Sequence, residues 1–510
     1  MTIPKNNILT RRMMDMWALS FGGIFIAEFF LNILRYPTEL DTTYHLLMGK
    51  ILSQHGLLFR HDILEFAPYG RYLGYPPLLH WMIACLRMVS SLDFFVIARI
   101  IVSFQVILFL AGIWYFARRY FGPCAAFAAL VFSVSVSDFW WWQTSVAPVA
   151  LAHAFFWPAI ILFLKKRWPW VLLLTTASFY LHMGFPYIMI SIMAVFSIWQ
   201  FKEDRIYAVR TAQIVIAALL LSLPQFLYFS KGYLSIFDPA ARRAMAPALF
   251  SGVQLGFVAK SLSVIFWAFI IIGIYDLLIR RARGIRTKEE RIVIASFFVL
   301  SLSSIFFYGS TRFHSQFPLA GALVAGIGFK SLAEFFTKRS AHLQKTKLAV
   351  LSILLLITSS FVEKVYISDV GCRAMLAPFG NQINSIVTGS PLASKHPYRI
   401  QDFLYRKDAD YLTDYIRTNI PKDEIIHMSN GALACYITLV TERLTDWGMF
   451  WEYLSEDSMR KIIAGRTRGY FIFQDDKYEA GLLFSGHEEL FEKQGDRIIR
   501  IGRYRILRVP

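Results

Sequence analysis

The chain has 510 residues, of which 56% are hydrophobic and 16% aromatic, and its mean hydropathy is +0.46. This balance excludes a single soluble core and is typical of a polytopic α-helical membrane protein. The formal net charge of +18 would suit nucleic acid. However, much of the basic excess lies in short loops between apolar runs, where membrane orientation already explains it, so no nucleic-acid partner is expected.

Apolar runs long enough to cross about 30 Å of hydrocarbon, roughly 20 residues each, recur between Asp15 and Ile367. They lie at about 17–34, 95–116, 123–140, 147–164, 168–183, 184–201, 209–229, 254–280, 290–308, 315–336 and 347–367. The predicted fold class is therefore a polytopic α-helical membrane protein of about 11 to 13 membrane helices, surrounded by membrane lipids.

Basic residues set the expected orientation. Lys5, Arg11 and Arg12 precede the first run and favour a cytoplasmic N-terminus. Later basic clusters fall between alternate pairs of runs, as the positive-inside rule requires, provided that Pro77 to Val89 lies at the membrane surface without crossing. We expect an integral protein of a bacterial or archaeal plasma membrane, with an extracytoplasmic C-terminal part.

The chain divides into a transmembrane domain over 1–367, a connector over 368–405 and a small α/β extracytoplasmic domain over 406–510. The connector is marked by prolines and glycines. In the last domain, the patterns predict helices over 408–419 and 457–464, strands over 424–428 and 470–473, and a closing hairpin over 497–508 around Gly502.

The first outer loop, residues 36–77, carries the candidate chemistry. If Thr42 to Gln54 forms a helix, Asp41 and His45 lie at i and i+4 on one face and can act on a shared ligand. Asp41 could deprotonate an acceptor or bind a cation, and His45 could donate a hydrogen bond to a phosphate. The alternative for Asp41 is a helix N-cap, because it stands before Thr-Thr-Tyr.

Four short patterns in this part of the chain resemble the first outer loop of GT-C superfamily glycosyltransferases. They are Asp41-x-x-Tyr44-His45-Leu46, His61-Asp62, Ala67-Pro68-Tyr69-Gly70-Arg71 and Tyr75-Pro76-Pro77-Leu78. Oligosaccharyltransferase catalytic subunits look closest, and protein O-mannosyltransferases and aminoarabinose transferases are similar in overall plan.

The resemblance implies a cell-envelope transferase that moves a sugar from a polyprenyl phosphate or diphosphate to a protein, lipid or glycan acceptor, with inversion. Asp41 matches the catalytic acid of the family, with His45 beside it. Arg312 and His314 occupy the late loop that holds the donor phosphate, although a boundary arginine that extends toward the membrane surface is the alternative for Arg312.

Four further residues of the first loop, Asp62, Glu65, Arg71 and Tyr75, are candidates for supporting the site. For Asp62 and Glu65 the favoured prediction is that they are solvated loop carboxylates, and the alternative is that they orient the loop or act as secondary acids.

The chain also departs from the family pattern. The second outer acidic motif of the family would fall between Trp141 and His153, where no carboxylate occurs. Whether the protein needs a divalent cation, Mg²⁺ or Mn²⁺, is therefore left open, and Asp41 would be the ligand if it does. His153 is expected to be a packed histidine. Whether Cys372 and Cys435 form a disulfide is also left open.

The main rival from another class is a polytopic transporter or a flippase for lipid-linked glycans. It predicts two related halves with interrupted spans, which the sequence does not show.

Overall fold

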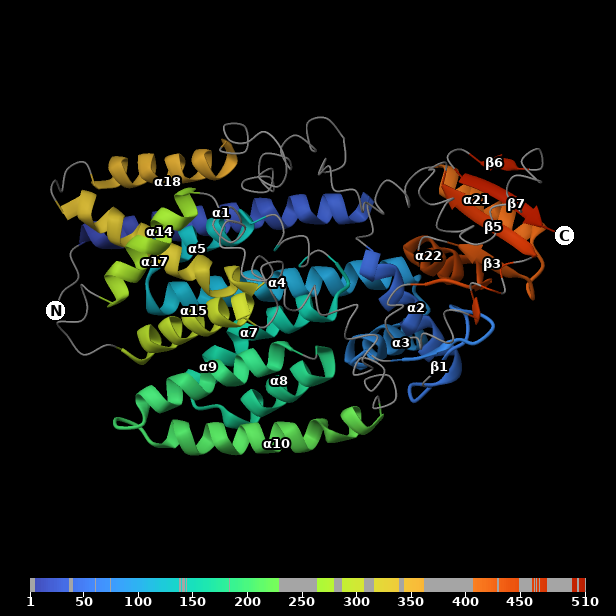
Figure 1. Ribbon diagram of the computed structural model, residues 1–510. Helices are drawn as coiled ribbons and strands as arrows, with labels where there is room; N and C mark the ends of the chain where they lie inside the picture. Colours follow the sequence, from blue (N-terminus) through green and yellow to red (C-terminus); the bar gives the residue numbers. More distant parts are fainter. Residues whose placement is uncertain are drawn as a thin grey trace.

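The computed structural model describes residues 5–228, 264–278, 287–306, 316–338, 344–361 and 407–509, apart from gaps at 36–39, 60, 74, 137–138, 140–142, 144, 183, 429–430, 449–460, 463, 465, 467, 475–497 and 502–503. Figure 1 shows an elongated molecule, with a bundle of long helices at one end and a small α/β domain at the other.

Every apolar run predicted above coincides with a helix. In chain order these helices are α1 (Lys5–Arg35), α4 (Phe94–Tyr120), α5 (Pro123–Val134), α7 (Pro148–Leu164), α8 (Trp168–Leu181), α9 (Phe185–Gln200), α10 (Ile206–Tyr228), α14 (Val264–Leu278), α15 (Lys288–Phe306), α17 (Pro318–Lys338) and α18 (Gln344–Phe361).

Within the described chain, three segments are long and apolar enough to cross a membrane: Phe94–Tyr120, Ile206–Leu227 and Pro318–Phe336. Several other helices, α5 among them, are apolar but shorter. The helical membrane-protein class is confirmed, and the number of crossings stays a prediction.

Close backbone contacts hold the centre of the bundle together. Helix α17 makes its most extensive contacts with α14 and α5. A Cβ atom at Gly328 would lie 2.0 Å from the carbonyl oxygen of Phe269, and one at Gly326 would lie 2.6 Å from that of Ala125. Only glycine permits such an approach, which is typical of helix contacts within membranes, where small residues let dispersion forces act between backbones.

An ion pair joins helices α1 and α4. Arg118, near the end of α4, donates from Nε and Nη2 to the two carboxylate oxygens of Asp15 in α1, at 2.5 and 2.7 Å. The start of α1 and the end of α4 therefore lie at the same end of the bundle. The helices between them, α2 (Leu40–His55) and α3 (Leu78–Ser90), lie at the opposite end, beside the C-terminal domain (Figure 1). This is the arrangement that the parity of the basic loops requires.

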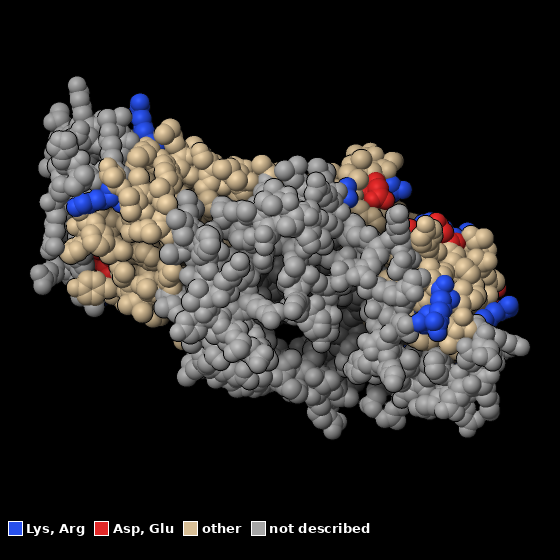
Figure 2. All heavy atoms as spheres, turned by 90° about the horizontal axis from the view of Figure 1, so that it is seen from above, with Lys and Arg blue, Asp and Glu red and all other residues tan. Residues whose placement is uncertain are grey.

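Charged side chains of the described residues are unevenly distributed. On the face in Figure 2, Lys, Arg, Asp and Glu lie toward the two ends of the molecule, and the described surface between them carries none. A long uncharged surface of this kind suits hydrocarbon, because a charge placed there would cost several kcal/mol.

The described residues of the C-terminal domain form a five-stranded sheet and two helices. Its elements are α21 (Lys407–Asn419), β3 (Ile425–Met428), α22 (Gly431–Thr441), β4 (Leu444–Thr445), β5 (Gly469–Gln474), β6 (Ile499–Ile501) and β7 (Tyr504–Val509). The strand order is β4-β3-β5-β7-β6, in which β3 is parallel to β4 and β5, while β7 is antiparallel to β5 and β6.

Helix α21, strands β3 and β5 and the hairpin of β6 and β7 lie where the sequence predicted them. The expected helix over 457–464 falls largely outside the described residues. Helix α22 was missed, because its side chains are buried on most sides, between the sheet and α2, and its sequence therefore lacks the polar stripe that marks a surface helix.

The first outer loop is joined to this domain by backbone hydrogen bonds. The amide of Ala67 donates to the carbonyl oxygen of Thr445 at 2.9 Å, and the amide of Thr445 donates to that of Leu64 at 3.0 Å. Helix α2 packs against α22, where Lys50 Nζ donates to the carbonyl oxygen of Leu439 at 2.7 Å. The loop and the domain therefore form one continuous unit at this end of the bundle.

Candidate active site beside the C-terminal domain

Helix α2 carries the principal candidates. It begins at Leu40, so Asp41 lies in its first turn and His45 lies one turn further on, at the i and i+4 spacing predicted from the sequence. Asp41 lies within the helix rather than before it, which weakens the N-cap alternative. Its side chain lies outside the described residues, and so do Arg312 and His314.

His45 is paired with a histidine that the sequence interpretation did not single out. Its Nδ1 lies 2.8 Å from Nε2 of His80 in α3, and the two rings stack with their centroids 5.1 Å apart. Burial, together with the neighbouring His80, holds the pKa of His45 well below its ordinary value, and burial lowers the pKa of His80 to about 3. Both imidazoles are therefore neutral at pH 7.

Two tyrosines complete an aromatic cluster around this pair. The ring centroid of Tyr75 lies 5.2 Å from that of His45 and 6.4 Å from that of Tyr44. The structure thus brings Tyr75, predicted as a supporting residue, into contact with His45.

The segment just before α7 meets α2 at its first turn. The amide of Val146 donates to Thr42 Oγ1 at 3.0 Å, directly beside Asp41 in the sequence. Gln105 in α4 holds this segment in place, because its Nε2 donates to the carbonyl oxygens of Gln143 and Ser145 at 2.8 and 2.7 Å. The starts of α2 and α7 therefore converge, and two helix N-termini favour a bound anion.

His153 is buried in α7, and its Nδ1 lies 2.9 Å from Nε2 of Gln143. This contact fits the packed histidine that the sequence predicted. The acidic motif expected between Trp141 and His153 has a candidate just before that window, Asp138, which the sequence interpretation did not include. The sequence signal that could have identified Asp138 is its position shortly after α5 and shortly before the segment that binds Thr42. Asp138 itself lies outside the described residues.

Asp62, Glu65 and Arg71 form a buried ion cluster, so the prediction that the two acids are solvated loop carboxylates is wrong. Arg71 Nη2 donates to Glu65 Oε2 at 2.5 Å, and its Nε lies 3.5 Å from Asp62 Oδ2. Asp62 faces inward because β1 (His61–Asp62) pairs with β2 (Arg71–Tyr72), which places His61 and Tyr72 on the opposite face. The loop between the two strands contacts the C-terminal domain, and both acids are fully buried.

This cluster joins the domain to α2. Burial raises the pKa of Glu65 to about 8, with Arg71 opposing and Asp62 reinforcing the shift. The guanidinium carbon of Arg71 lies 5.0 Å from the ring centroid of Tyr44, the neighbour of His45. Arg71 therefore links the loop acids to the helix that carries the candidate site, which is a supporting role through position.

Residues of the C-terminal domain surround Glu65. Cys435 Sγ lies 2.5 Å from Glu65 Oε1, and a Cβ atom at Gly448 would lie 2.5 Å from the same oxygen. Cys435 is a thiol, so the disulfide that the sequence left open is not formed here, and Cys372 lies outside the described residues.

The side chains that the structure describes include no group of three His, Cys, Asp or Glu residues that could hold a metal ion.

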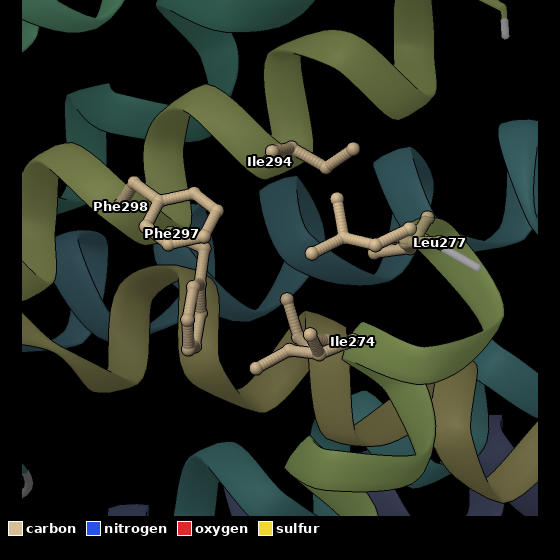
Figure 3. Close-up of a pocket in the computed structure, with 7 residues that line it drawn as sticks. Ile274, Leu277, Ile294, Phe297 and Phe298 are labelled. Atoms are coloured by element: carbon tan, nitrogen blue, oxygen red, sulfur yellow. The ribbon is translucent and has the colours of Figure 1, made fainter. Parts of the chain in front are cut away.

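A pocket opens within the bundle, between α14, α15 and α17 (Figure 3). It is lined by Ile274, Leu277, Leu278, Ile294, Phe297, Phe298 and Val324. These side chains offer no hydrogen-bonding group, so the pocket is not a site for phosphate.

Comparison with known proteins places the fold. No protein-family model matches the chain, and no curated protein matches it. Among solved structures, ArnT from Cupriavidus metallidurans bound to undecaprenyl phosphate is 13% identical and aligns over 96% of this chain and 97% of its own, with a TM-score of 0.56. The archaeal oligosaccharyltransferase AglB from Archaeoglobus fulgidus, in complex with an inhibitory peptide and a dolichol-phosphate, is 12% identical and aligns over 91% and 70%, with a TM-score of 0.59.

At a sequence identity of 12 to 13%, these two structures show the fold of the chain and nothing more. The chain therefore has the fold of the GT-C membrane glycosyltransferases, as the residues of its first outer loop predicted.

Proposed function

We propose that this protein is a membrane glycosyltransferase that moves a sugar from a polyprenyl phosphate or diphosphate to an acceptor at the extracytoplasmic face, with inversion. The observation that carries the proposal is the position of Asp41 and His45 in the first turns of α2, within a chain that shares the fold of ArnT over nearly its full length. The ArnT structure holds undecaprenyl phosphate, and the AglB structure holds a dolichol-phosphate.

The convergent starts of α2 and α7 support a phosphate at this place. Amide groups in the first turn of a helix point outward along its axis and carry partial positive charge. The bond from Val146 to Thr42 brings the two helix starts together beside Asp41. Arg312 and His314 of the late loop would add cationic and hydrogen-bonding groups to the donor phosphate.

The reaction follows from these positions. Asp41 accepts the proton of an acceptor hydroxyl or amide, whose oxygen or nitrogen attacks the anomeric carbon of the sugar. The bond from that carbon to the phosphate oxygen breaks, and the lipid phosphate leaves with the electron pair. A single displacement inverts the anomeric carbon. His45 donates a hydrogen bond to the leaving phosphate, whose negative charge grows in the transition state.

We infer that the donor carries a single sugar, because the chain aligns with nearly all of ArnT, an aminoarabinose transferase. The acceptor would reach Asp41 beside the C-terminal domain, which is fixed to the first outer loop.

The test is transfer of a labelled sugar from synthetic polyprenyl phosphate donors by the purified full chain in lipid nanodiscs. We expect Asp41→Asn to lower turnover by about 10²- to 10⁴-fold, the usual contribution of a general base. Asp414→Asn is the matched control, since Asp414 is an exposed acid of α21 in a surface ion pair with Arg417. Asp138→Asn asks whether the carboxylate passed over by the sequence interpretation is also needed.

Undiminished turnover in a folded Asp41→Asn protein would reject this role. The rival flippase predicts a different outcome: labelled lipid would cross the bilayer of a sealed vesicle, and no glycosylated product would form.

A further inference from the structure

The least expected contact near α2 is the one between two buried histidines on different helices. His45 was a candidate from the sequence, whereas His80 stands in the apolar helix α3 and carried no predicted role. Nδ1 of His45 lies 2.8 Å from Nε2 of His80, a normal hydrogen-bond distance.

We propose that His80 is a positioning residue that fixes the tautomer of His45, so that His45 presents an N–H group to the donor phosphate. The proposal rests on the function proposed above and assigns a role to a residue that never touches the substrate.

The chemistry of the pair requires a choice. A neutral imidazole has one N–H group and one acceptor nitrogen, so only one of the two facing nitrogens carries the shared hydrogen. If His80 donates from Nε2, Nδ1 of His45 is the acceptor and the proton of His45 lies on Nε2. If His45 donates from Nδ1, its Nε2 carries a lone pair, which would repel a phosphate oxygen. Only the first arrangement gives His45 a donor for the leaving group.

Burial keeps the histidine pair in one tautomeric arrangement. His45 and His80 are 0% and 2% exposed, and the ring of Tyr75 covers both, with centroids 5.2 and 6.4 Å away. Water therefore has little access with which to exchange the tautomers. A cationic imidazole is also disfavoured here, because burial would remove its hydration.

A glycine sets the distance between the two histidines. Gly49 lies one helical turn after His45, and a Cβ atom there would lie 2.3 Å from Cγ2 of Ile83, which is close to His80 on α3. Helices α2 and α3 can approach to hydrogen-bond distance at the histidines only because this position has no side chain. Gly49→Ala therefore separates the pair without altering either imidazole.

Two substitutions of His80 distinguish positioning from packing. His80→Gln keeps an amide N–H near the position of Nε2, whereas His80→Leu keeps the bulk but removes the donor. We expect His80→Leu to weaken transfer roughly tenfold, the usual effect of one neutral hydrogen bond, and His80→Gln to stay within roughly threefold of the parent. A packing role predicts the reverse order, because leucine suits an apolar site better than glutamine does.

Nitrogen NMR of the full chain labelled with ¹⁵N-histidine reads the tautomer directly, with the His45→Gln spectrum as the assignment. We expect the proton of His45 on Nε2 in the parent protein and a shift toward Nδ1 in His80→Leu and in Gly49→Ala. A parent protein with the proton on Nδ1, or equal losses of transfer in the leucine and glutamine variants, would overturn the proposal.

The NMR measurement separates this inference from the function on which it rests. If the protein transfers no sugar from any polyprenyl phosphate donor, the proposed function fails, whereas the position of the His45 proton still tests the role of His80. Combining Gly49→Ala with His80→Leu adds a check: if both act through the same hydrogen bond, the double variant loses no more transfer than either single variant.

Discussion

Replacing Arg71 with alanine should detach the first outer loop from the C-terminal domain. Arg71 is buried and pairs with Glu65 at 2.5 Å and Asp62 at 3.5 Å, and its guanidinium carbon lies 4.7 Å from the ring centroid of Phe66. Removing one partner of a buried ion pair typically costs about 3 to 5 kcal/mol, because the remaining charges stay away from water without compensation. The carboxylates left behind carry that cost here, and Glu65 contributes to it above about pH 8, where it is ionised.

The two backbone hydrogen bonds between Ala67, Thr445 and Leu64 report this loss directly, because they join the loop to the domain. A loss of about 3 to 5 kcal/mol corresponds to a fall of about 10²- to 10⁴-fold in the protection of those amides from hydrogen exchange. Mass spectrometry of peptides that cover 62–68 and 443–447 would measure it.

The matched control is Arg417→Ala, since Arg417 forms an exposed pair with Asp414 at 3.3 Å and should change local stability by less than about 1 kcal/mol. Unchanged protection in the Arg71 variant would refute the reasoning, because the ion cluster would then contribute nothing to docking.

Two further predictions concern the same loop. The pKa of Glu65 is about 8 in the folded protein, above its ordinary value of 4.5, so the folded state holds an extra proton between these values. Thermal stability should therefore fall as the pH rises from about 5 to 8, and Glu65→Gln should flatten this slope; a parent protein with no slope would contradict the assignment. Gly70→Ala should destabilise the loop by at least about 1 to 2 kcal/mol, because Gly70 has φ +63° and a Cβ there would lie 2.3 Å from the carbonyl oxygen of Asp62. Gly56→Ala is the control, with φ +99° and no atom within 4 Å, and equal melting temperatures of the two variants would exclude the clash.

The parts of this protein that could be predicted are those fixed by local geometry. An apolar run must form a helix in a membrane, because no water is present to satisfy its backbone, and every run in the sequence coincides with a helix. The relation between Asp41 and His45 also follows from helical spacing alone. The expectation that α3 lies at the membrane surface rests on the alternation of the basic loops and stays a prediction.

The sequence did not indicate which distant side chains would meet. His80 looked like one polar residue in an apolar helix, and its contact with His45 depends on the absence of a side chain at Gly49. The loop acids looked solvated because nothing in their own segment covers them. A domain more than 350 residues further along the chain buries Glu65, through Cys435 and Gly448.

The sequence by itself determined that apolar helices dominate this protein, their order along the chain and the spacing of Asp41 and His45, because hydropathy and helical periodicity act over a few turns of chain. Only the tertiary structure decided the burial of Glu65, the convergence of two helix starts beside Asp41 and the partner of His45. Burial, and the hydrogen bonds and pKa shifts that follow from it, depend on segments that meet only when the chain is folded.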